Sequence, residues 1–292
     1  MTAVIVLAEQ EWRARQEAYV SRMRKWVDPH QQRKALGQKH PVLDFLFSYY
    51  SYRPTRLLRW HPGPDVALAG DASEFLSWTG YVQTPEGVTL SRDLLTAQRR
   101  ESVSFVRSLL AATQSRPPRL GCFGLHEWAM VYRTSEIRHE SWPLRLGSAG
   151  TDTVVESLPI KCGHFDAFRF FTPEARPLNT LQPTRATQIA MEQPGCLHAN
   201  MDLFKWSYKL APFTPSELIA DCFELASDVR ELDMRASPYD LRELGYSPVP
   251  IETAAGRATY ARLQAEFASR AAPLRTRLIA LCTQLLDPED ND

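Results

Sequence analysis

Long hydrophobic runs are missing from this sequence of 292 residues. No stretch approaches the roughly 18 consecutive apolar residues that a membrane-spanning helix requires. The short apolar run of residues 1–7 is followed by Glu9 and Glu11 and not by a small-residue cleavage site, which is unlike a secretory signal peptide. We therefore expect a cytoplasmic protein without a membrane partner.

Cysteine is also scarce, with five residues at wide spacings. An odd number of widely spaced cysteines argues against a disulfide framework. Three of them have a histidine nearby: Cys122 with His126, Cys162 with His164, and Cys196 with His198. These six side chains could bind zinc or an iron–sulfur cluster, but their spacings match no known metal-binding motif. Small buried cysteines are the favoured interpretation, so the sequence predicts no metal and no other cofactor.

The chain has no net charge, which at first weakens a nucleic-acid interpretation. The charges are unevenly distributed, however. Residues 13–59 contain eleven bases and three acids, a net charge of +8, whereas residues 217–292 contain eight arginines and fourteen acids, a net charge of −6. A basic first quarter can form one positive face that binds phosphates, although paired surface charges would give the same asymmetry. The candidate phosphate ligands are Lys39, Arg53, Arg56 and Arg59.

Helical periodicity dominates both ends of the chain. Apolar residues recur at helical spacing in residues 8–36, where Pro29 is expected to break or kink the helix. A second helix is expected between Pro41 and Pro54, since proline can open a helix and the residue before a proline disfavours one. Further helices are predicted for residues 91–113, 185–191, 196–209, 215–234 and 252–286, the last interrupted at Pro273.

Short strands are predicted in the middle of the chain. Turn residues separate the apolar runs between Leu57 and Leu90, and the turn at residues 85–87 indicates a hairpin. Residues 153–160 have the pattern of another strand. A strand over residues 162–171 would place His164 and Asp166 on the same side.

These elements predict a helix-rich α+β fold, a single domain with a small sheet of short strands. Within it we expect a basic N-terminal helical part (residues 1–60), a central α/β part (residues 61–210) and C-terminal helices (residues 211–286). A frayed acidic tail would follow them.

The stretch from Lys161 to Trp206 mixes acids, bases and amides with aromatic rings. A structural core would fill this length mainly with aliphatic residues, because charged and amide groups cost several kcal/mol to bury without partners. The mixture is typical of a concave site that holds a flat ligand. A polar network that joins two helices is the alternative interpretation.

Asp44 is the single acid of the expected helix 41–54, and the residues after it are almost all aromatic. Such surroundings disfavour the charged form and raise the pKa of a carboxyl unless a cation or hydrogen-bond donors compensate. His40 and Ser48, four residues before and after it, lie on the same helical face. The alternative is an acid at a helix start that interacts only with its own backbone. Both interpretations remain open at this point.

His126 and Glu127 form half of a zinc-protease motif. Position 130 is Met130, however, where that motif has its second histidine. We reject a zinc protease on this ground, although either side chain can still line a pocket.

Three blocks of sequence carry a family resemblance. The first, residues 40–54, contains His-Pro-x-x-Asp-Phe-Leu-Phe; the second, residues 164–173, reads His-Phe-Asp-Ala-Phe-Arg-Phe-Phe-Thr-Pro; the third, residues 192–202, reads Glu-Gln-Pro-Gly-Cys-Leu-His-Ala-Asn-Met-Asp. In these blocks, and over nearly its full length, the chain resembles a group of bacterial, largely actinobacterial, proteins known as 3-methyladenine DNA glycosylases. It has neither a helix-hairpin-helix signature with its catalytic aspartate nor the water-activating motifs of uracil glycosylases. No catalytic residue therefore carries over from those better-known families.

The resemblance implies a monofunctional DNA glycosylase that acts on double-stranded DNA, and we expect it to be a monomer. Such an enzyme flips a modified or damaged base into a pocket, holds it between rings, and hydrolyses its N-glycosidic bond through an oxocarbenium-like state, leaving an abasic site. The base would be an alkylated purine, in DNA repair, or a bulky modified base of phage DNA, in antiviral defence. Polar side chains near the expected pocket favour a neutral base whose substituents must be recognised.

This task needs a carboxylate, hydrogen-bonding groups, aromatic rings and basic residues, and the sequence contains all four. The candidates for the carboxylate that stabilises the cationic sugar or activates water are Asp44 and Asp166. The candidate base-binding residues are Tyr49, Tyr50, Glu127, His164, Phe168, Gln193, His198 and Asn200. The phosphate ligands would be the four basic residues named above.

Two other functions fit the same residues. A protein that binds modified nucleic acid without cutting it would keep the basic and aromatic surface, but it would not depend on Asp44 or Asp166. A metal-dependent hydrolase would use the cysteine and histidine pairs as ligands.

Overall fold

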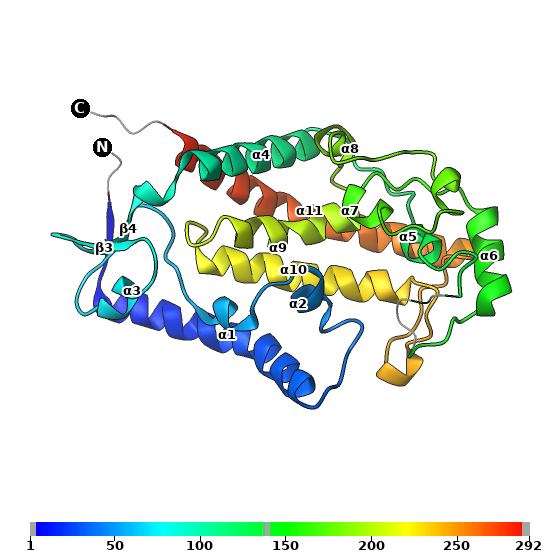
Figure 1. The fold of residues 1–292 in the computed structure, drawn as a ribbon, viewed down its shortest axis with the longest axis horizontal. Coiled ribbons are helices and arrows are strands. Elements are labelled where there is room, and N and C mark those ends of the chain that lie inside the picture. Colours follow the sequence, from blue (N-terminus) through cyan, green and yellow to red (C-terminus); the bar gives the residue numbers. More distant parts are fainter. Residues whose placement is uncertain (1–3, 136, 138–140, 288–292) are drawn as a thin grey trace. The chain divides into compact units, whose positions relative to one another are not determined.

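The computed structural model describes residues 4–135, 137 and 141–287 (Figure 1). These residues form a helix-rich α+β fold with one small sheet, which confirms the predicted fold class. No helix in this part of the chain has both the length and the apolar character needed to cross a bilayer. The expected frayed tail lies outside the described residues, apart from Asp287.

Contacts divide the chain into two compact units that are each assembled from separate segments. Unit 1 comprises Met1–Leu110, Leu203–Glu224 and Leu274–Asp292, and unit 2 comprises Ala111–Asp202 and Leu225–Pro273. All four boundaries fall inside helices: α4 (Ala97–Gln114), α9 (Leu197–Lys209), α10 (Ser216–Arg235) and α11 (Ala254–Leu286). That the units act as a single domain remains a prediction.

Unit 1 contains the sheet, whose strands follow in the order β1-β2-β4-β3. β1 (Ile5–Leu7) pairs parallel with β2 (Val66–Leu68), and β4 (Gly87–Leu90) pairs antiparallel with β2 and with β3 (Tyr81–Thr84). The β3-β4 hairpin confirms the turn predicted at residues 85–87. The remaining short elements of unit 1 are α2 (Phe45–Tyr49), α3 (Ser73–Leu76) and the 3₁₀ turns Pro54–Leu58 and Arg92–Leu94.

α1 (Glu9–Ala35) is the long helix of unit 1, as its periodicity predicts. Trp12, Tyr19 and Met23 are buried at intervals of seven and four residues, so they share one face. The Trp12 indole N–H donates to the carbonyl of Ala69 (2.9 Å), which joins the helix to the end of β2. The helix continues through Pro29 to Ala35, so the predicted break does not occur.

The helix predicted between Pro41 and Pro54 is much shorter, because only residues 45–49 are helical. Ser51 adopts a left-handed backbone conformation (φ 54°), which ends the helical path well before Pro54. The segment is held by side-chain contacts instead, including stacked rings of Phe45 and Tyr49 (centroids 4.9 Å apart).

Unit 2 contains short helices between the long ones. They are α5 (Leu125–Ala129), α6 (Gly147–Ser157), α7 (Phe165–Phe168), α8 (Gln188–Met191) and the 3₁₀ turns Arg176–Leu178 and Arg242–Leu244. The strands predicted at residues 153–160 and 162–171 are wrong, since α6 and α7 occupy these positions. Short apolar runs fit a strand and a buried helix equally well. In α6 the buried residues Thr151, Val154 and Val155 have helical spacing, which is consistent with a helix that buries one face.

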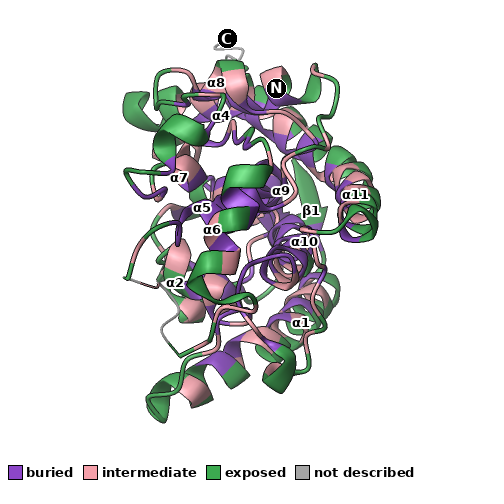
Figure 2. Ribbon diagram, turned by 90° about the vertical axis from the view of Figure 1, so that its right-hand side faces the viewer, coloured by how far each residue is buried: buried purple, intermediate pink, exposed green. Residues whose placement is uncertain are grey.

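The long helices of the C-terminal half agree with the prediction. α9 and α10 have the expected positions, and α11 passes through Pro273 without the predicted interruption. Figure 2 shows α10 as mainly buried, and its apolar face includes Phe223, Leu225 and Val229. Two ionic residues, Arg230 and Asp233, are buried on the same helix.

Asp44 fixes the segment before α2 to α1. Its carboxylate is bonded to Nδ1 of His30 (2.8 Å), accepts from Nη2 of Arg33 (2.6 Å), and accepts from the backbone N–H of His40 (2.8 Å). Burial would raise the pKa of Asp44, but these donors and the Arg33 charge outweigh it and hold that pKa below its ordinary value. The expectation of an acid that interacts only with its own backbone is therefore wrong.

We expect Asp44→Asn to lower the free energy of unfolding by about 2 kcal/mol at pH 7, because it removes the charge that Arg33 faces. The pKa of Asp44 is depressed in the folded state, so its contribution is complete above the unfolded pKa of about 3.9 and is lost as the pH falls further. Urea unfolding at pH 7 and at pH 3 measures this. A difference between wild type and variant that does not shrink at pH 3 would contradict the prediction.

Candidate functional site

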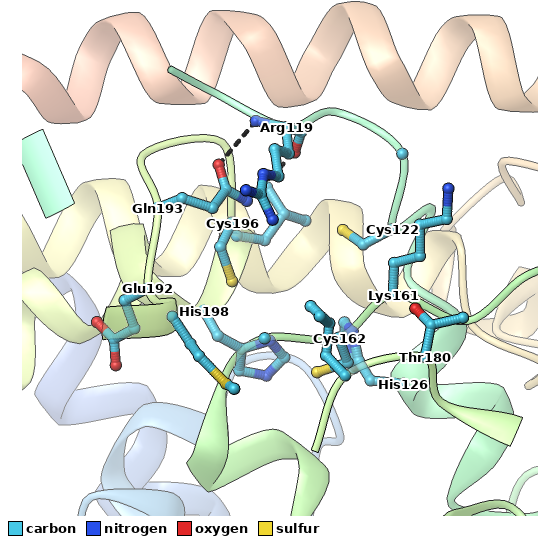
Figure 3. A pocket seen from close by; sticks show the side chains of 15 residues that line it. Arg119, Cys122, His126, Lys161, Cys162, Thr180, Glu192, Gln193, Cys196 and His198 are labelled. Carbon is cyan, nitrogen blue, oxygen red and sulfur yellow. Dashed lines mark hydrogen bonds between the residues drawn. The ribbon is translucent and has the colours of Figure 1, made fainter. Parts of the chain in front are cut away.

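Unit 2 contains a partly open cavity of about 130 Å³ (Figure 3). Its walls come from the chain before and within α5, the segment before α7, residues 180–181, and the stretch from the end of α8 to the start of α9. Three of these four wall segments belong to the stretch Lys161–Trp206 that the sequence singles out. The polar residues of the lining are Arg119, Cys122, His126, Lys161, Cys162, Thr180, Glu192, Gln193, Cys196 and His198.

A buried ionic network stands behind one wall of the cavity. His126 and Glu127 lie side by side on α5, and Arg230 and Asp233 lie one turn apart on α10. Nε2 of His126 is 2.7 Å from the Asp233 carboxylate, and Nη1 of Arg230 donates to both Asp233 and Glu127 at 2.8 Å. All four residues are at most 5% exposed. The network therefore locks α5, and with it His126, onto α10.

Arg230 gives both acids of this network a partner of opposite charge. Burial alone would raise the pKa of Asp233, but the charge and hydrogen bond of His126, with Arg230 on the other oxygen, hold it well below its ordinary value. Asp233 is therefore ionised at neutral pH. A buried carboxylate of this kind is stable only while its partners remain.

A second polar group surrounds His164 at the start of α7. The backbone N–H of Ala167 donates to Nδ1 of His164 (3.3 Å), so a neutral ring carries its proton on Nε2. Nε2 faces the carboxylates of Asp202 (3.4 Å) and Glu192 (3.6 Å). Glu192 also accepts from the side-chain amide of Gln188 (2.7 Å). His164 thus caps a helix and lies close to two acids.

His198 lies between these two groups, at the start of α9. Its ring packs against the edge of His126 (centroids 4.3 Å apart) and stacks on His164 (5.2 Å). Burial, and then the neighbouring His126, lower the pKa of His198 far below its ordinary value. The ring is therefore neutral at pH 7 and has one hydrogen-bond donor and one acceptor at the cavity.

The turn between α8 and α9 is held by side-chain amides. Oε1 of Gln193 accepts from the backbone N–H groups of Arg119 (2.8 Å) and Gly195 (2.7 Å), and its Nε2 donates to the Arg119 carbonyl (3.2 Å). No side chain would fit at Gly195, where a Cβ atom would lie 2.8 Å from the Arg119 carbonyl oxygen. Gln193 lines the cavity, but these bonds occupy its amide in the wall.

Three cysteines line the same cavity, although they come from segments far apart in sequence. Burial raises the pKa of all three thiols, that of Cys162 to about 12. They are therefore protonated at neutral pH and are poor nucleophiles. Figure 3 shows the sulfur atoms of Cys122, Cys162 and Cys196 around one open space, near the ring of His198.

Among the described residues, His126, His198 and Asp233 are the group that could hold a metal ion, since their ligand atoms lie within 4.8 Å of one another. Arg230 already supplies a positive charge to Asp233, so a cation there would be repelled. The thiols of Cys122, Cys162 and Cys196 line the same cavity but do not form such a close group.

The structure distributes the sequence-predicted site residues over both units. In unit 2, Gln193 and His198 line the cavity, while Glu127, His164 and Asn200 are buried close to it in the networks of its wall. Asn200 donates to the carbonyl of Pro194 (3.0 Å). Phe168 and Asp166 are half-buried on α7 and do not belong to the cavity lining; Asp166 lies 3.6 Å from the guanidinium of Arg169.

The other predicted residues belong to unit 1. Asp44 is held by the ion pair with Arg33, and Tyr49 and Tyr50 pack against each other with ring centroids 4.9 Å apart. Arg56 and Arg59 line a second, more open pocket of about 340 Å³, whereas Arg53 and Lys39 do not. Catalytic, base-binding and phosphate-binding roles for these residues remain predictions.

Several residues of the site were not predicted from sequence. Arg230 and Asp233 carry a visible signal, since they interrupt the apolar face of an otherwise amphipathic helix. Glu192, the acid in the cavity lining, opens the third block of the family resemblance. Lys161 and Arg119, which are exposed at the cavity, have no distinguishing pattern.

Comparisons with protein families, curated proteins and solved structures gave no match to this chain. Among the described residues, Glu192 is the one acid that lines the cavity.

We expect Asp233→Asn to lower the free energy of unfolding by about 3–5 kcal/mol, because it leaves a buried guanidinium without one of its two acids. Asp228→Asn is the matched control on the same helix, since Asp228 forms an exposed ion pair with Arg270. Loss of this exposed ion pair should lower the free energy of unfolding by less than about 1 kcal/mol. Urea unfolding of both variants tests this, and equal losses would show that the buried network does not stabilise the fold.

Proposed function

We propose that this protein is a DNA base glycosylase that accepts one flipped, modified or damaged base in the cavity of unit 2 and hydrolyses its N-glycosidic bond. The observation that carries the proposal is the cavity itself. It places a buried carboxylate, a neutral imidazole and two exposed cations around a space of about 130 Å³. The second and third blocks of the resemblance to DNA glycosylases lie in and around this cavity.

The size of the cavity suits a single base. Pockets for drug-sized ligands span roughly 300–1,000 Å³, so this cavity fits a smaller, flat molecule. A base that is stacked inside a duplex cannot enter this cavity, so it must first flip out of the base stack. Lys161 and Arg119 are exposed at the cavity, where they can meet the phosphates beside a flipped nucleotide.

The polar groups of the cavity suit the recognition of a neutral base. The neutral His198 ring can donate one hydrogen bond and accept another, which is the pattern needed at the edge of a base. A hydrogen bond from His198 to the departing base would also lower the barrier to its loss. The thiols of the lining are protonated and therefore poor nucleophiles. They form part of the cavity wall, and the proposed reaction does not use a cysteine nucleophile.

The carboxylate is the remaining requirement. Loss of the base leaves positive charge on the sugar, which a nearby carboxylate stabilises before water attacks. Glu192 is the leading candidate because it lines the cavity and its carboxylate accepts a hydrogen bond from Gln188. Asp44 and Asp166, the candidates from sequence, are tested beside it.

The substrate class is a modified or damaged base, with an alkylated purine of genomic DNA and a bulky modified base of phage DNA as the two alternatives. Purified protein is incubated with duplex oligonucleotides that contain an alkylated purine, uracil or a hypermodified cytosine, and abasic sites are revealed by alkaline cleavage. We expect cleavage for an alkylated purine or a hypermodified cytosine. No abasic site from any of them would overturn the proposal, and tight binding without cleavage would support a non-catalytic binding protein instead.

Variants identify the acid in the same assay. Glu192→Gln should lower the single-turnover rate by about 100-fold or more, because it removes charge that stabilises the transition state. Glu156→Gln, an exposed acid of the same unit, should leave the rate unchanged. If Asp44→Asn or Asp166→Asn abolishes cleavage while Glu192→Gln does not, the catalytic carboxylate is the one predicted from sequence.

A metal-dependent hydrolase is the second candidate, because three thiols and two imidazoles share the cavity lining. Soft ligands of this kind suit zinc or an iron–sulfur cluster. Elemental analysis of the purified protein tests it. Stoichiometric metal that is lost in Cys162→Ser but retained in Cys222→Ser would favour this candidate, since Cys222 is a buried cysteine of unit 1. Cleavage of a modified oligonucleotide by metal-free protein would exclude it.

A further inference from the structure

Unit 1 contains a pocket that the glycosylase chemistry does not use. It measures about 340 Å³ and is more open than the cavity of unit 2. Arg56 and Arg59 reach it from the 3₁₀ turn Pro54–Leu58 and the residue after it, and Arg99 reaches it from α4. Three aromatic side chains, Tyr19, Trp78 and Tyr208, belong to its walls.

The three arginines are exposed and have no acidic partner among the described residues. This distinguishes them from most other arginines of unit 1, such as Arg22, which is bonded to Asp221 and Glu224. Three unneutralised guanidinium groups around one hollow create a positive potential that attracts an anion. Guanidinium groups bind phosphate oxygens in a bidentate manner, which makes phosphate the fitting anion.

The walls of the pocket suit an unpaired base. The Arg59 guanidinium lies 5.3 Å from the centre of the Trp78 ring, and Tyr208 stacks on Tyr52 (centroids 3.4 Å apart). Trp78 and Tyr208 are both half-buried, so part of each ring remains accessible. Bases of single-stranded nucleic acid stack on accessible rings of this kind, beside arginines that follow the backbone.

His61 adds a neutral polar group to the pocket. Burial, and then the nearby Arg59 charge, lower its pKa to about 4, and its Nδ1 is bonded to the hydroxyl of Tyr81 (2.9 Å). The ring is therefore uncharged at neutral pH and can hydrogen-bond a base or a sugar hydroxyl. Since the lining residues of this pocket include no acid, it has no carboxylate for glycosidic hydrolysis.

A double helix does not fit this arrangement, because its bases are stacked inside and its phosphates follow a convex surface. A hollow with cations and rings together takes one nucleotide whose base is already exposed. We propose that this pocket binds a nucleotide of single-stranded DNA, with the phosphate on Arg56, Arg59 and Arg99 and the base against Trp78. This site is separate from the cavity of unit 2 and does not depend on the proposed glycosylase activity.

Fluorescence anisotropy with unmodified oligothymidine, single-stranded or annealed to its complement, tests the proposal without any cleavage. We expect the single strand to bind at least about tenfold more tightly than the duplex. Arg59→Ala and Arg99→Ala should each weaken binding of the single strand, and each should reduce the slope of log K against log salt by about 0.7. Trp78→Ala should weaken binding by about tenfold and leave this slope unchanged, because stacking releases no counterions.

Arg24→Ala is the matched control, since Arg24 is an exposed arginine of the same unit that does not line the pocket. The affinity of this variant for the single strand should stay within about twofold of the wild-type affinity. An equal loss of affinity in Arg24→Ala and Arg59→Ala would show diffuse attraction and would overturn the proposed site. Equal affinity for single strand and duplex would overturn it as well. Circular dichroism of each variant shows that the fold is retained, and Trp78→Phe replaces Trp78→Ala if the latter unfolds.

Discussion

The buried pairing of Arg230 with Glu127 and Asp233 is the constraint on which the site in unit 2 depends. Taking these charges out of water costs several kcal/mol each, and the structure recovers this only because every charge has a partner within 2.8 Å. The partners come from α5 and α10, so the pairing fixes the two helices in one register. His126 is the next residue to Glu127 and is carried into the cavity wall by the same constraint.

The chemistry of the cavity follows from how burial acts on each residue type. Burial lowers the pKa of an imidazole and raises that of a thiol, so His198 and the three cysteines are all uncharged at pH 7. Carboxylates remain charged there only where donors reach them, as at Asp233. Asp44 shows the other consequence of such pairing. Its oxygens are already occupied by His30, Arg33 and the backbone, which leaves little capacity for a substrate.

The arginines of the protein fall into two groups with different physical roles. Arg230 and Arg33 are largely buried and paired with acids, and they stabilise the fold. Arg56, Arg59 and Arg99 are exposed around a pocket without an acid to neutralise them. Net charge does not reveal this difference, because both groups count equally in a sum that is zero for the whole chain. The unpaired group has the charge that a phosphate backbone needs.

Local patterns in the sequence determined the elements whose signal is long or chemically distinct. The periodicity of α1, α9, α10 and α11 extends over three or more turns, and the turn residues at 85–87 favour a hairpin by themselves. Short apolar runs gave wrong strand predictions, because residues such as Val154 and Val155 fit a strand as well as a helix until their neighbours in the fold are known. The polar and aromatic composition of residues 161–206 also marked three of the segments that line the cavity.

Tertiary structure alone decided which polar groups meet. Glu127 and Arg230 are 103 residues apart, and the three cysteines of the cavity come from three separate segments. Asp44 and Glu192 are both acids among rings and amides in the sequence, yet one is neutralised by α1 and the other lines a cavity. The sequence by itself determined the helices and the composition of the site, because these depend on near neighbours. The ionisation and accessibility of each side chain depend on partners that only the folded chain brings within hydrogen-bonding distance.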